Sequence, residues 1–576
     1  MLQTLIRKGG GGQNSLDDPN SGEFPQPEEE TTYTFKTYEE YFTDNNITND
    51  ITLTTIEGDG SSASPYIINS TNDFWYASKY LSWDNKYVEL ACDIMLNDET
   101  FDEDGNPSGG DRVVYEWKPM FKKVGFFEGK GNLIKGLHFN DETISSYTGL
   151  FAHEVEVVKN LLLSDFFVRG KGNVNVLGNR VSALENVKTL NGYVKACDSY
   201  VSGMVGVAEK ITNCANMATV LSPYWGASGI VTTILTGGIV SDCVNYGDII
   251  VDNGTSVTGR AGGITQCVTK ENVTIINCKN YGEIKSTGGQ TGGIVGWISA
   301  SSGIIENCEN YANITAFNSV GGISGSAHNQ MNFIIRNCSN FGSIFCSDAA
   351  RNMGGGILGQ VANSGCLNIE GCKNYGYLSS NCGGEIAGDL YNNAIPENET
   401  CEVVIKNCAG YFGKSLIYQV GKVKLKVENC LIFSKSFTNP YIFATYFRVD
   451  AEVSIINFMA EVKTDQSTIC FFRSVHDNRV QLNIRNVFLN ICGTNFSNAE
   501  FLCMSMKEDN NVDGVVVKVN TATSLYKHYY GTDFSGFYIS FKNGRIGLVG
   551  IDGRGQFSGT MDEEALQNLG FEKKTI

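Results

Sequence analysis

The sequence predicts an all-β protein: a single-stranded right-handed parallel β-helix (solenoid) of about 30 residues per coil, with a flexible N-terminal tether and a small C-terminal capping element. Three observations predict this fold class. A short phrase recurs from Asn213 to about Asn486, apolar residues alternate within each copy, and Gly-Gly-Ile triplets recur between copies. A fixed period of this length is typical of solenoids, in which each repeat stacks on its neighbours.

The recurring phrase is an aliphatic pair, Asn-Cys, a polar residue, Asn with Tyr or Phe, Gly, and an Ile two residues on, and it is clearest at 276–284, 305–314 and 335–344. Apolar residues alternate inside a copy, as at 274–278, which is the period of a strand. Phe458 and Val487 take the place of the Cys in the last two copies. The Cys of the earlier copies are Cys214, Cys243, Cys278, Cys308, Cys338, Cys372, Cys408 and Cys430.

These repeated side chains are expected to form structural ladders along the solenoid. The chain has 18 Cys but no Cys-x-x-Cys pair, so we expect free thiols that pack in the core as small hydrophobic groups. Disulfides and metal binding are the less favoured alternatives. Because equivalent residues of stacked coils lie above one another, Asn277, Asn307 and Asn337 are expected to form ladders of amide hydrogen bonds.

The Gly-Gly-Ile triplets are expected to mark corners, because glycine permits tight bends and close backbone approach while Ile points into the core. Some copies depart from the pattern: Gly371 replaces the Asn before Cys372, and Glu385 interrupts one Gly-Gly-Ile triplet. We expect these departures to change local turns only. The triplets begin at Gly237, Gly262, Gly292, Gly321 and Gly355.

The ends of the chain differ from the repeats. We expect residues 1–33 to be a flexible tether or docking peptide, with Leu2, Leu5 and Ile6 on one helical face. Residues 34–195 are expected to form an N-terminal cap and the first coils of the β-helix, including a short helix near 72–81. Residues 196–510 then form the repeat β-helix. Residues 511–576 are expected to be a C-terminal cap, a hairpin at the Asn543-Gly544 turn followed by a short helix after Thr560.

The copies resemble the GLUG-type repeats of bacterial surface adhesins and phage tail appendage proteins. The resemblance is strongest from Gly292-Gly293-Ile294-Val295-Gly296 through Ile314, and it covers residues 55–375 well and 400–490 loosely. It implies a right-handed parallel β-helix with a role in adhesion or host recognition.

The formal net charge of −18 disfavours nucleic acids and anionic membranes as partners. No stretch is long and apolar enough for a transmembrane helix, so no membrane insertion is expected. The first residues also lack the apolar segment of a secretory signal. We expect no cofactor and no metal. The expected partners are other virion, tail or surface-assembly proteins at the N-terminus and a host surface glycan or protein; a homo-oligomer is left open.

No motif in the sequence is a catalytic signature. Exposed aromatic side chains can stack on sugar rings, and the candidates for ligand binding are Tyr224, Trp225, Trp297, Tyr529 and Tyr530. Core packing is the alternative for each of them, and the repeated Tyr246, Tyr281, Tyr311 and Phe341 are expected to be structural. Carboxylates that could form a glycan-cleaving pair on one face are Asp242, Asp248, Glu283, Glu306 and Glu309.

These observations predict a non-enzymatic structural and recognition rod that binds a host surface glycan or protein. The missing secretory signal and the many free thiols favour a phage tail or fibre protein of the virion, assembled in the reducing host cytoplasm. Two alternatives stay open: a bacterial cell-surface adhesin, and a β-helical polysaccharide depolymerase or lyase.

Overall fold

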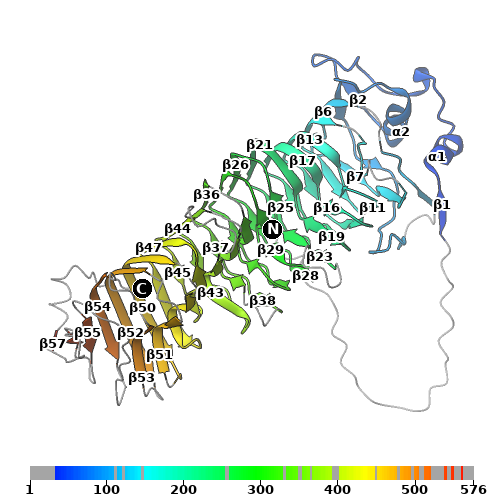
Figure 1. The fold of residues 1–576 in the computed structure, drawn as a ribbon. Helices are drawn as coiled ribbons and strands as arrows, with labels where there is room; N and C mark the ends of the chain where they lie inside the picture. The colour runs from blue at the N-terminus through cyan, green and yellow to red at the C-terminus, as the bar shows by residue number, and fades with distance from the viewer. Residues whose placement is uncertain are drawn as a thin grey trace, which may run out of the picture.

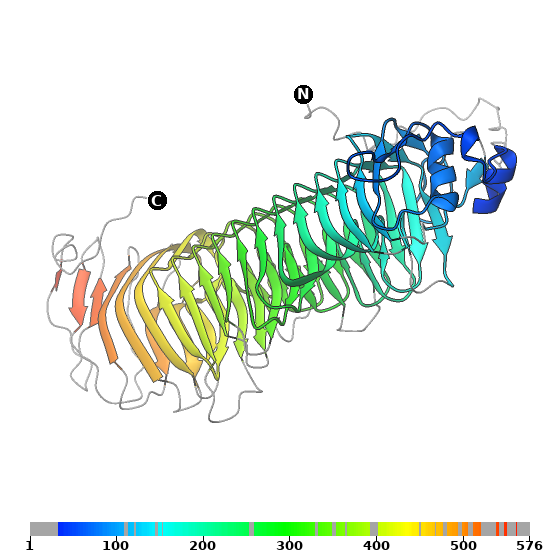
Figure 2. The same ribbon diagram turned by 90° about the horizontal axis from the view of Figure 1, so that it is seen from above.

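The computed structural model shows an elongated rod of stacked coils with two short helices at its N-terminal end (Figures 1 and 2). It describes residues 33–504, except 109–112, 120–122, 144–147, 153, 253–258, 329–331, 348–352, 363–365, 392–400, 448–450, 467, 476–480 and 494–497. It also describes the strands β54 (Asn511–Val519), β55 (Phe537–Ser540), β56 (Ile546–Val549) and β57 (Thr560–Met561).

Each central coil contains five short strands in a fixed order, and equivalent strands of successive coils pair in parallel to form five rows, A to E. The strand before the Asn-Cys pair forms row A: β3 (Tyr87–Leu90), β6 (Val124–Glu128), β9 (Val155–Lys159), β13 (Gly178–Glu185), β17 (Val205–Thr212), β21 (Val231–Ser241), β26 (Val273–Ile276), β31 (Ser302–Glu306), β36 (Asn332–Arg336), β41 (Leu367–Glu370), β44 (Glu402–Lys406), β47 (Lys424–Glu428), β50 (Glu452–Thr464) and β52 (Gln481–Gly493). The strand after it forms row B: β4 (Ile94–Met95), β7 (Leu133–Lys135), β10 (Leu162–Ser164), β14 (Lys188–Thr189), β18 (Ala215–Asn216), β22 (Val244–Asn245), β27 (Lys279–Asn280), β32 (Glu309–Asn310), β37 (Ser339–Asn340), β42 (Lys373–Asn374), β45 (Ala409–Gly410) and β48 (Leu431–Phe437).

The other three rows complete the coil. Row C is a separate parallel sheet: β8 (His138–Asp141), β11 (Phe166–Gly170), β15 (Gly192–Ala196), β19 (Thr219–Ser222), β23 (Ile249–Val251), β28 (Ile284–Ser286), β33 (Ile314–Ala316) and β38 (Ile344–Cys346). Row D contains β12 (Val174–Asn175), β16 (Tyr200–Ser202), β20 (Gly226–Ser228), β24 (Arg260–Gly262), β29 (Gln290–Gly292), β34 (Val320–Gly321), β39 (Gly354–Gly355) and the first part of β43 (Cys382–Tyr391). Row E contains β25 (Thr265–Val268), β30 (Val295–Ile298), β35 (Ser324–His328), β40 (Leu358–Ala362), the rest of β43, β46 (Ser415–Gly421), β49 (Tyr441–Phe447), β51 (Thr468–Val475) and β53 (Asn498–Met504).

The register of these strands confirms the predicted fold class, a parallel β-helix. In row C, for example, Ile284 pairs with Ile314 and Ile314 with Ile344, so residues one repeat apart lie directly above one another. Strands stacked in this way lie about 4.8 Å apart. One repeat of the sequence therefore corresponds to one coil, and it advances the chain from one strand to the next strand in the same row.

The Asn before each repeated Cys forms the corner between rows A and B. Asn277, Asn307 and Asn337 are exposed there and have φ angles of 57°, 53° and 54°. Asn tolerates this left-handed conformation better than most residues. Two coils have another residue in place of this Asn, and both residues keep the left-handed conformation: Asp242 has a φ of 56° and Gly371 a φ of 65°. The missing Asn before Cys372 is thus explained by backbone geometry.

The Gly-Gly-Ile triplets lie at the bend between rows D and E, except the first. Ile264, Ile294, Ile323 and Ile357, the third residues of four triplets, are fully buried. Gly237-Gly238-Ile239 instead lies inside β21, and Ile239 is 41% exposed. The prediction for this triplet is wrong, because the D to E bend of that coil is at Gly229 and Ile230, which precede β21.

Two helices and an aromatic cluster close the N-terminal end of the rod. The helices are α1 (Tyr38–Asp44) and α2 (Thr71–Tyr80), beside β1 (Thr34–Lys36), the 3-10 turn η1 (Ile51–Leu53), β2 (Tyr66–Ile68) and β5 (Val113–Tyr115). Helix α2 packs Phe74 and Trp75 into the core, next to Trp117. This cluster shields the apolar interior of the first coil from water.

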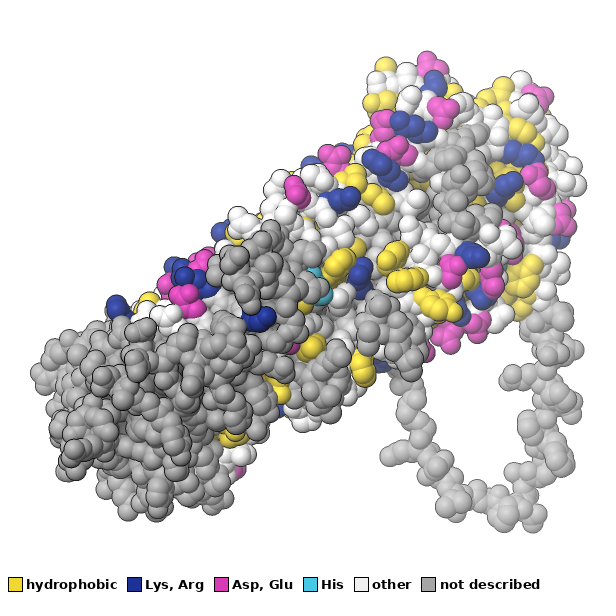
Figure 3. Space-filling view, viewed as in Figure 1, with side chains coloured by type: hydrophobic (Ala, Val, Ile, Leu, Met, Phe, Trp, Pro, Cys, Tyr) yellow, Lys and Arg dark blue, Asp and Glu magenta, His cyan; other side chains and the backbone are white. Residues whose placement is uncertain are grey.

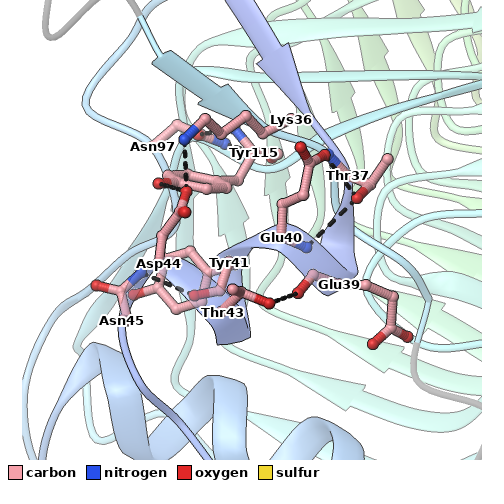
Figure 4. A network of polar contacts seen from close by, with 10 residues as sticks. All are labelled: Lys36, Thr37, Glu39, Glu40, Tyr41, Thr43, Asp44, Asn45, Asn97 and Tyr115. Atoms are coloured by element: carbon pink, nitrogen blue, oxygen red, sulfur yellow. Dashed lines mark hydrogen bonds and ion pairs between the residues drawn. The ribbon is translucent and has the colours of Figure 1, made fainter.

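Polar contacts fix α1 against the β1–β5 pair (Figure 4). Thr37 and Glu40 form a capping box at the start of the helix. Asp44, at its end, accepts hydrogen bonds from Lys36 Nζ at 2.6 Å and Tyr115 Oη at 2.9 Å. The N-terminal cap therefore holds together through both apolar packing and directed polar contacts.

At the C-terminal end, β54 and β55 continue the parallel stack and β55 then pairs antiparallel with β56. The Asn543-Gly544 turn lies outside the described residues, as do residues 1–32 and 562–576. Thr560 and Met561, where the sequence predicted the start of a short helix, form β57. Among the described residues, no helix is long and apolar enough to cross a membrane.

Candidate functional site

The outer surfaces of rows D and E converge near the middle of the rod. Arg260 and Gln290 in row D each alternate with a buried neighbour, so they point outward, and Trp297, His328 and Gln360 do the same in row E. Outward side chains of two adjoining faces can touch only where the faces form a concave angle. We call this set, completed by Ser319 before β34, the corner strip.

Side chains of the two rows meet across this angle. The Arg260 guanidinium carbon lies 3.8 Å from the centre of the Trp297 ring, a close cation–π contact. Ser319 Oγ donates to Gln360 Oε1 at 2.9 Å, and Gln290 Nε2 lies 3.5 Å from His328 Nε2. The contacts join residues from four successive coils, so they depend on the register of the stack.

Glycine allows the two rows to approach. A Cβ atom on Gly296 would lie 2.7 Å from the carbonyl oxygen of Ala261 and 2.9 Å from that of Gln290. Gly325, one coil further, would place a Cβ 2.4 Å from the amide nitrogen of Thr291. Larger residues at these positions would force the rows apart and open the angle in which the corner strip lies.

The charges in the corner strip come from arginine rather than histidine. Burial, together with the neighbouring Arg260, lowers the pKa of His328 to about 4, so its ring is neutral at pH 7. Among the described residues Arg260 has no carboxylate partner within ion-pair distance, and its Nε donates to Gln290 Oε1 at 2.9 Å. The strip therefore presents one fixed positive charge.

Several buried polar atoms in this region have no hydrogen-bond partner among the described residues. They include Trp297 Nε1, Ser326 Oγ, Gln266 Oε1 and Thr291 Oγ1. Trp297 pairs with Ser326 in the next coil and with Cys267, the neighbour of Gln266, in the preceding one. Because these atoms are shielded from the surface, each one left without a bond costs the protein some stability.

Two of the predicted ligand-binding residues lie beside the corner strip. Tyr224 and Trp225 are 55% and 50% exposed in the turn between β19 and β20. The carbonyl oxygen of Trp225 accepts a hydrogen bond from the amide of Arg260, which places this turn one coil before the arginine. Figure 3 looks onto this side of the rod, where hydrophobic and basic side chains and a histidine lie close together near the middle.

Other predicted residues lie elsewhere. Tyr529 and Tyr530 and the docking residues Leu2, Leu5 and Ile6 lie outside the described residues. The ladder cysteines line the core, and neighbouring sulfurs are in contact. Those that are buried as free thiols are Cys214, Cys243, Cys278, Cys308, Cys338, Cys372, Cys408 and Cys430.

The Asn residues form two ladders rather than one. At the exposed corner, Asn307 Nδ2 donates to Asn277 Oδ1 at 3.3 Å, and Asn277 Nδ2 donates to Asp242 at 3.1 Å. The second Asn of the repeat forms a fully buried ladder in row B that the sequence analysis missed. Each Nδ2 in it donates to the next Oδ1 at 2.8 or 2.9 Å, through Asn216, Asn245, Asn280, Asn310, Asn340 and Asn374.

The repeated aromatic residues form a stacked column on the outside of the rod. Neighbouring rings are 4.7–5.2 Å apart and nearly parallel, and most are about 40% exposed. Because each ring covers the faces of its neighbours, mainly ring edges reach the solvent. The column contains Tyr246, Tyr281, Tyr311, Phe341, Tyr375 and Tyr411.

The carboxylates considered for glycan cleavage have basic or amide partners. Glu283 pairs with Lys285 at 2.8 Å, Glu309 with Lys279 at 2.6 Å, and Glu306 with Arg336 at 2.8 Å. The bonds with lysine lower the pKa of Glu283 and Glu309. A general acid needs the opposite shift.

The remaining two carboxylates accept hydrogen bonds from the chain. Asp242 accepts from Asn277 Nδ2 at 3.1 Å and Asp248 from the amide of Glu283 at 2.9 Å. In the described part of the chain, no group of three or more His, Cys, Asp or Glu residues is arranged to hold a metal ion.

Comparisons with known proteins do not assign this chain to a family. No protein-family model matches the chain, and no curated protein does, so the resemblance to GLUG-type repeats stays a prediction. Among solved structures, the chain is similar to the crystal structure of "a putative immunoglobulin A1 protease from Bacteroides ovatus", with 19% identity and a TM-score of 0.33 over 55% of this chain and 77% of that one. The assignment of a parallel β-helix rests on the strand register described above.

Proposed function

We propose that this chain is a recognition rod that binds a surface glycan along the corner strip and the adjacent Tyr224–Trp225 turn. The observation that carries the proposal is the position of Trp225, half exposed and one coil from the Arg260–Trp297 pair. Exposed aromatic rings stack on sugar rings, and nearby polar groups then select among sugars. The parallel β-helix supplies a rigid support for this surface.

The proposed setting is a phage tail or fibre-type virion protein, held by its N-terminal segment to other virion proteins. The buried, unpaired thiols support this setting, because free cysteines persist in a reducing cytoplasm and are uncommon in secreted proteins. Host recognition would then be the role of the rod.

A binding assay with matched variants tests the proposal. Purified protein is incubated with host surface polysaccharide, and both bound saccharide and new reducing ends are measured. We expect binding without new reducing ends, and about 10-fold weaker binding for Trp225→Ala. Tyr281→Ala, which removes an exposed ring from the aromatic column, should bind as the unmodified protein does. Equal binding by Trp225→Ala, or release of reducing ends, would contradict the proposal.

A further inference from the structure

Arg260 lacks a carboxylate partner among the described residues, although the chain has a net charge of −18. Arginine pairs readily with carboxylates, and Arg336 does so with Glu306 at 2.8 Å. Arg260 instead lies against Trp297 at 3.8 Å and uses its Nε for Gln290. Within the described residues its two Nη nitrogens have no acceptor, so a planar fork of N–H donors is available on the surface.

The Arg260 guanidinium therefore determines which ligand fits the surface. Its N–H groups only donate, and they lie in one plane with a fixed spacing. A ligand with two closely spaced acceptor oxygens matches this arrangement, and a carboxylate provides them.

We propose that the corner strip binds a sugar that bears a carboxylate, such as a uronic or sialic acid. The carboxylate lies on the Arg260 guanidinium, and the ring of the same or the next sugar stacks on Trp225. This inference rests on the proposed glycan-binding function and names the class of sugar. The neutral ring of His328 adds no second charge, so one carboxylate matches the strip.

An acidic peptide would also satisfy Arg260, but the neighbouring surface favours a sugar. Tyr224 and Trp225 are both at least half exposed, and their turn lies one coil before Arg260. Flat aromatic faces suit the apolar faces of sugar rings. Polyglutamate therefore serves as a competing probe.

The test compares each acidic saccharide with its carboxyl-reduced form. The panel contains oligomers of galacturonate, mannuronate and glucuronate, sialyllactose, and polyglutamate, and calorimetry measures binding to the full chain. We expect at least one acidic saccharide to bind about 10-fold or more tightly than its reduced form, and more tightly than polyglutamate. Arg260→Gln should abolish that difference, and Arg260→Lys should keep only part of it, because lysine lacks the fork.

Lys285→Gln is the control, since it removes a surface cation from row C and should leave the preference unchanged. Equal affinity for acidic and reduced saccharides would overturn the inference and leave the glycan-binding proposal standing. Tighter binding of polyglutamate would also overturn it, in favour of an acidic peptide. If no saccharide bound, the inference and the proposed function would both fall. Thermal melting of each variant shows whether it is folded.

Discussion

The central and C-terminal coils keep the same strand register with different interiors. From about residue 200 to 375 the coils carry the buried Asn ladder of row B, and their strands are mostly two to five residues long. Beyond Glu385 the ladder ends, and β50 and β52 run for 13 residues each around the buried Phe458 and Val487. The hydrogen bonds of the buried ladder fix where each central strand ends, whereas the apolar interior of the C-terminal coils allows longer strands.

The buried ladder explains why the central coils need their Gly-Gly corners. A Cβ on Gly293 would lie 2.4 Å from the Asn310 side chain, and one on Gly322 would lie equally close to Asn340. Each ladder Asn also donates its second Nδ2 hydrogen to a carbonyl two residues on, as Asn310 does to Ala312 at 2.9 Å. The glycines and asparagines of the repeat are therefore complementary.

Glu385 marks the boundary between the two regions. It occupies the second-glycine position of its coil, while Gly410 pairs with Asn374 and so occupies the next ladder position. Its carboxylate accepts hydrogen bonds from Asn374 Nδ2 at 2.7 Å and from the amides of Gly413 and Lys414 at 2.6 and 2.8 Å. A Cβ on Gly410 would overlap the Glu385 side chain, so the two exchanges compensate each other.

The largest effect is expected from filling a central corner. Gly322→Ala would place a methyl group 2.1 Å from the Gly356 carbonyl oxygen and 2.4 Å from Asn340 Cγ, and should lower the free energy of unfolding by about 4 kcal/mol. Gly131→Ala has no neighbour within 4 Å and should cost about 1 kcal/mol for its positive φ. Urea unfolding of both variants checks this; similar losses would show that the corner is not tightly packed.

Breaking the buried ladder should cost somewhat less. Asn310→Ala leaves Asn280 Nδ2 without its acceptor and Asn340 Oδ1 without its donor, and should destabilise the protein by about 3 kcal/mol. Asn307→Ala, at the exposed corner, should cost about 1 kcal/mol. The same unfolding assay compares them. An equal loss at the two sites would mean that the buried amides do not hold the central coils together.

The boundary predicts a compensating pair of substitutions. Glu385→Gly and Gly410→Asn each break the boundary, the first by leaving Asn374 and two amides unpaired, the second by overlap with Glu385. Combined, they restore the central pattern, so the double variant should be about 2 kcal/mol more stable than the sum of the single effects predicts. Strictly additive effects in this double-mutant cycle would contradict the exchange.

The smallest effect concerns pH. Burial raises the pKa of Glu385 above the value of about 4.3 of an unfolded glutamate. Between these two values the folded state binds more protons than the unfolded state, so this residue's contribution to stability falls as pH rises. The stability difference between the unmodified protein and Glu385→Gln, from melting curves at a series of pH values, should therefore decrease as pH rises. An increase would contradict the direction of the shift.

The stack of coils could be predicted from the sequence because residues that recur at the coil period must lie above one another in neighbouring coils. The Cys row and the corner Asn recur at the coil period, and Gly371 and Asp242 keep that corner. The buried Asn ladder has the same period. Its sequence pattern, an Asn before Tyr or Phe, does not show whether the Asn side chain points into the rod or out of it. Burial of a polar side chain is decided by the partner in the next coil.

The corner strip could be predicted only in part. Trp297 and Trp225 stood out as aromatic residues near corners, but Arg260 and His328 did not, because each is 30 or more residues from the side chains that it contacts. The coil length and the angle between rows D and E bring them together. The role of Glu385 could not be predicted either, because the glycine that leaves room for its side chain is Gly410, in the following coil.

Successive copies stack in one register, with their sulfurs in a shared dry interior. Residue-resolved alkylation, followed by mass spectrometry of the folded and the urea-unfolded protein, tests this arrangement. We expect the eight ladder thiols, Cys214 to Cys430, to react only after unfolding, and the half-buried Cys92, Cys197 and Cys366 to react sooner. Rapid alkylation of the ladder thiols in the folded protein, or their recovery as disulfides, would contradict it.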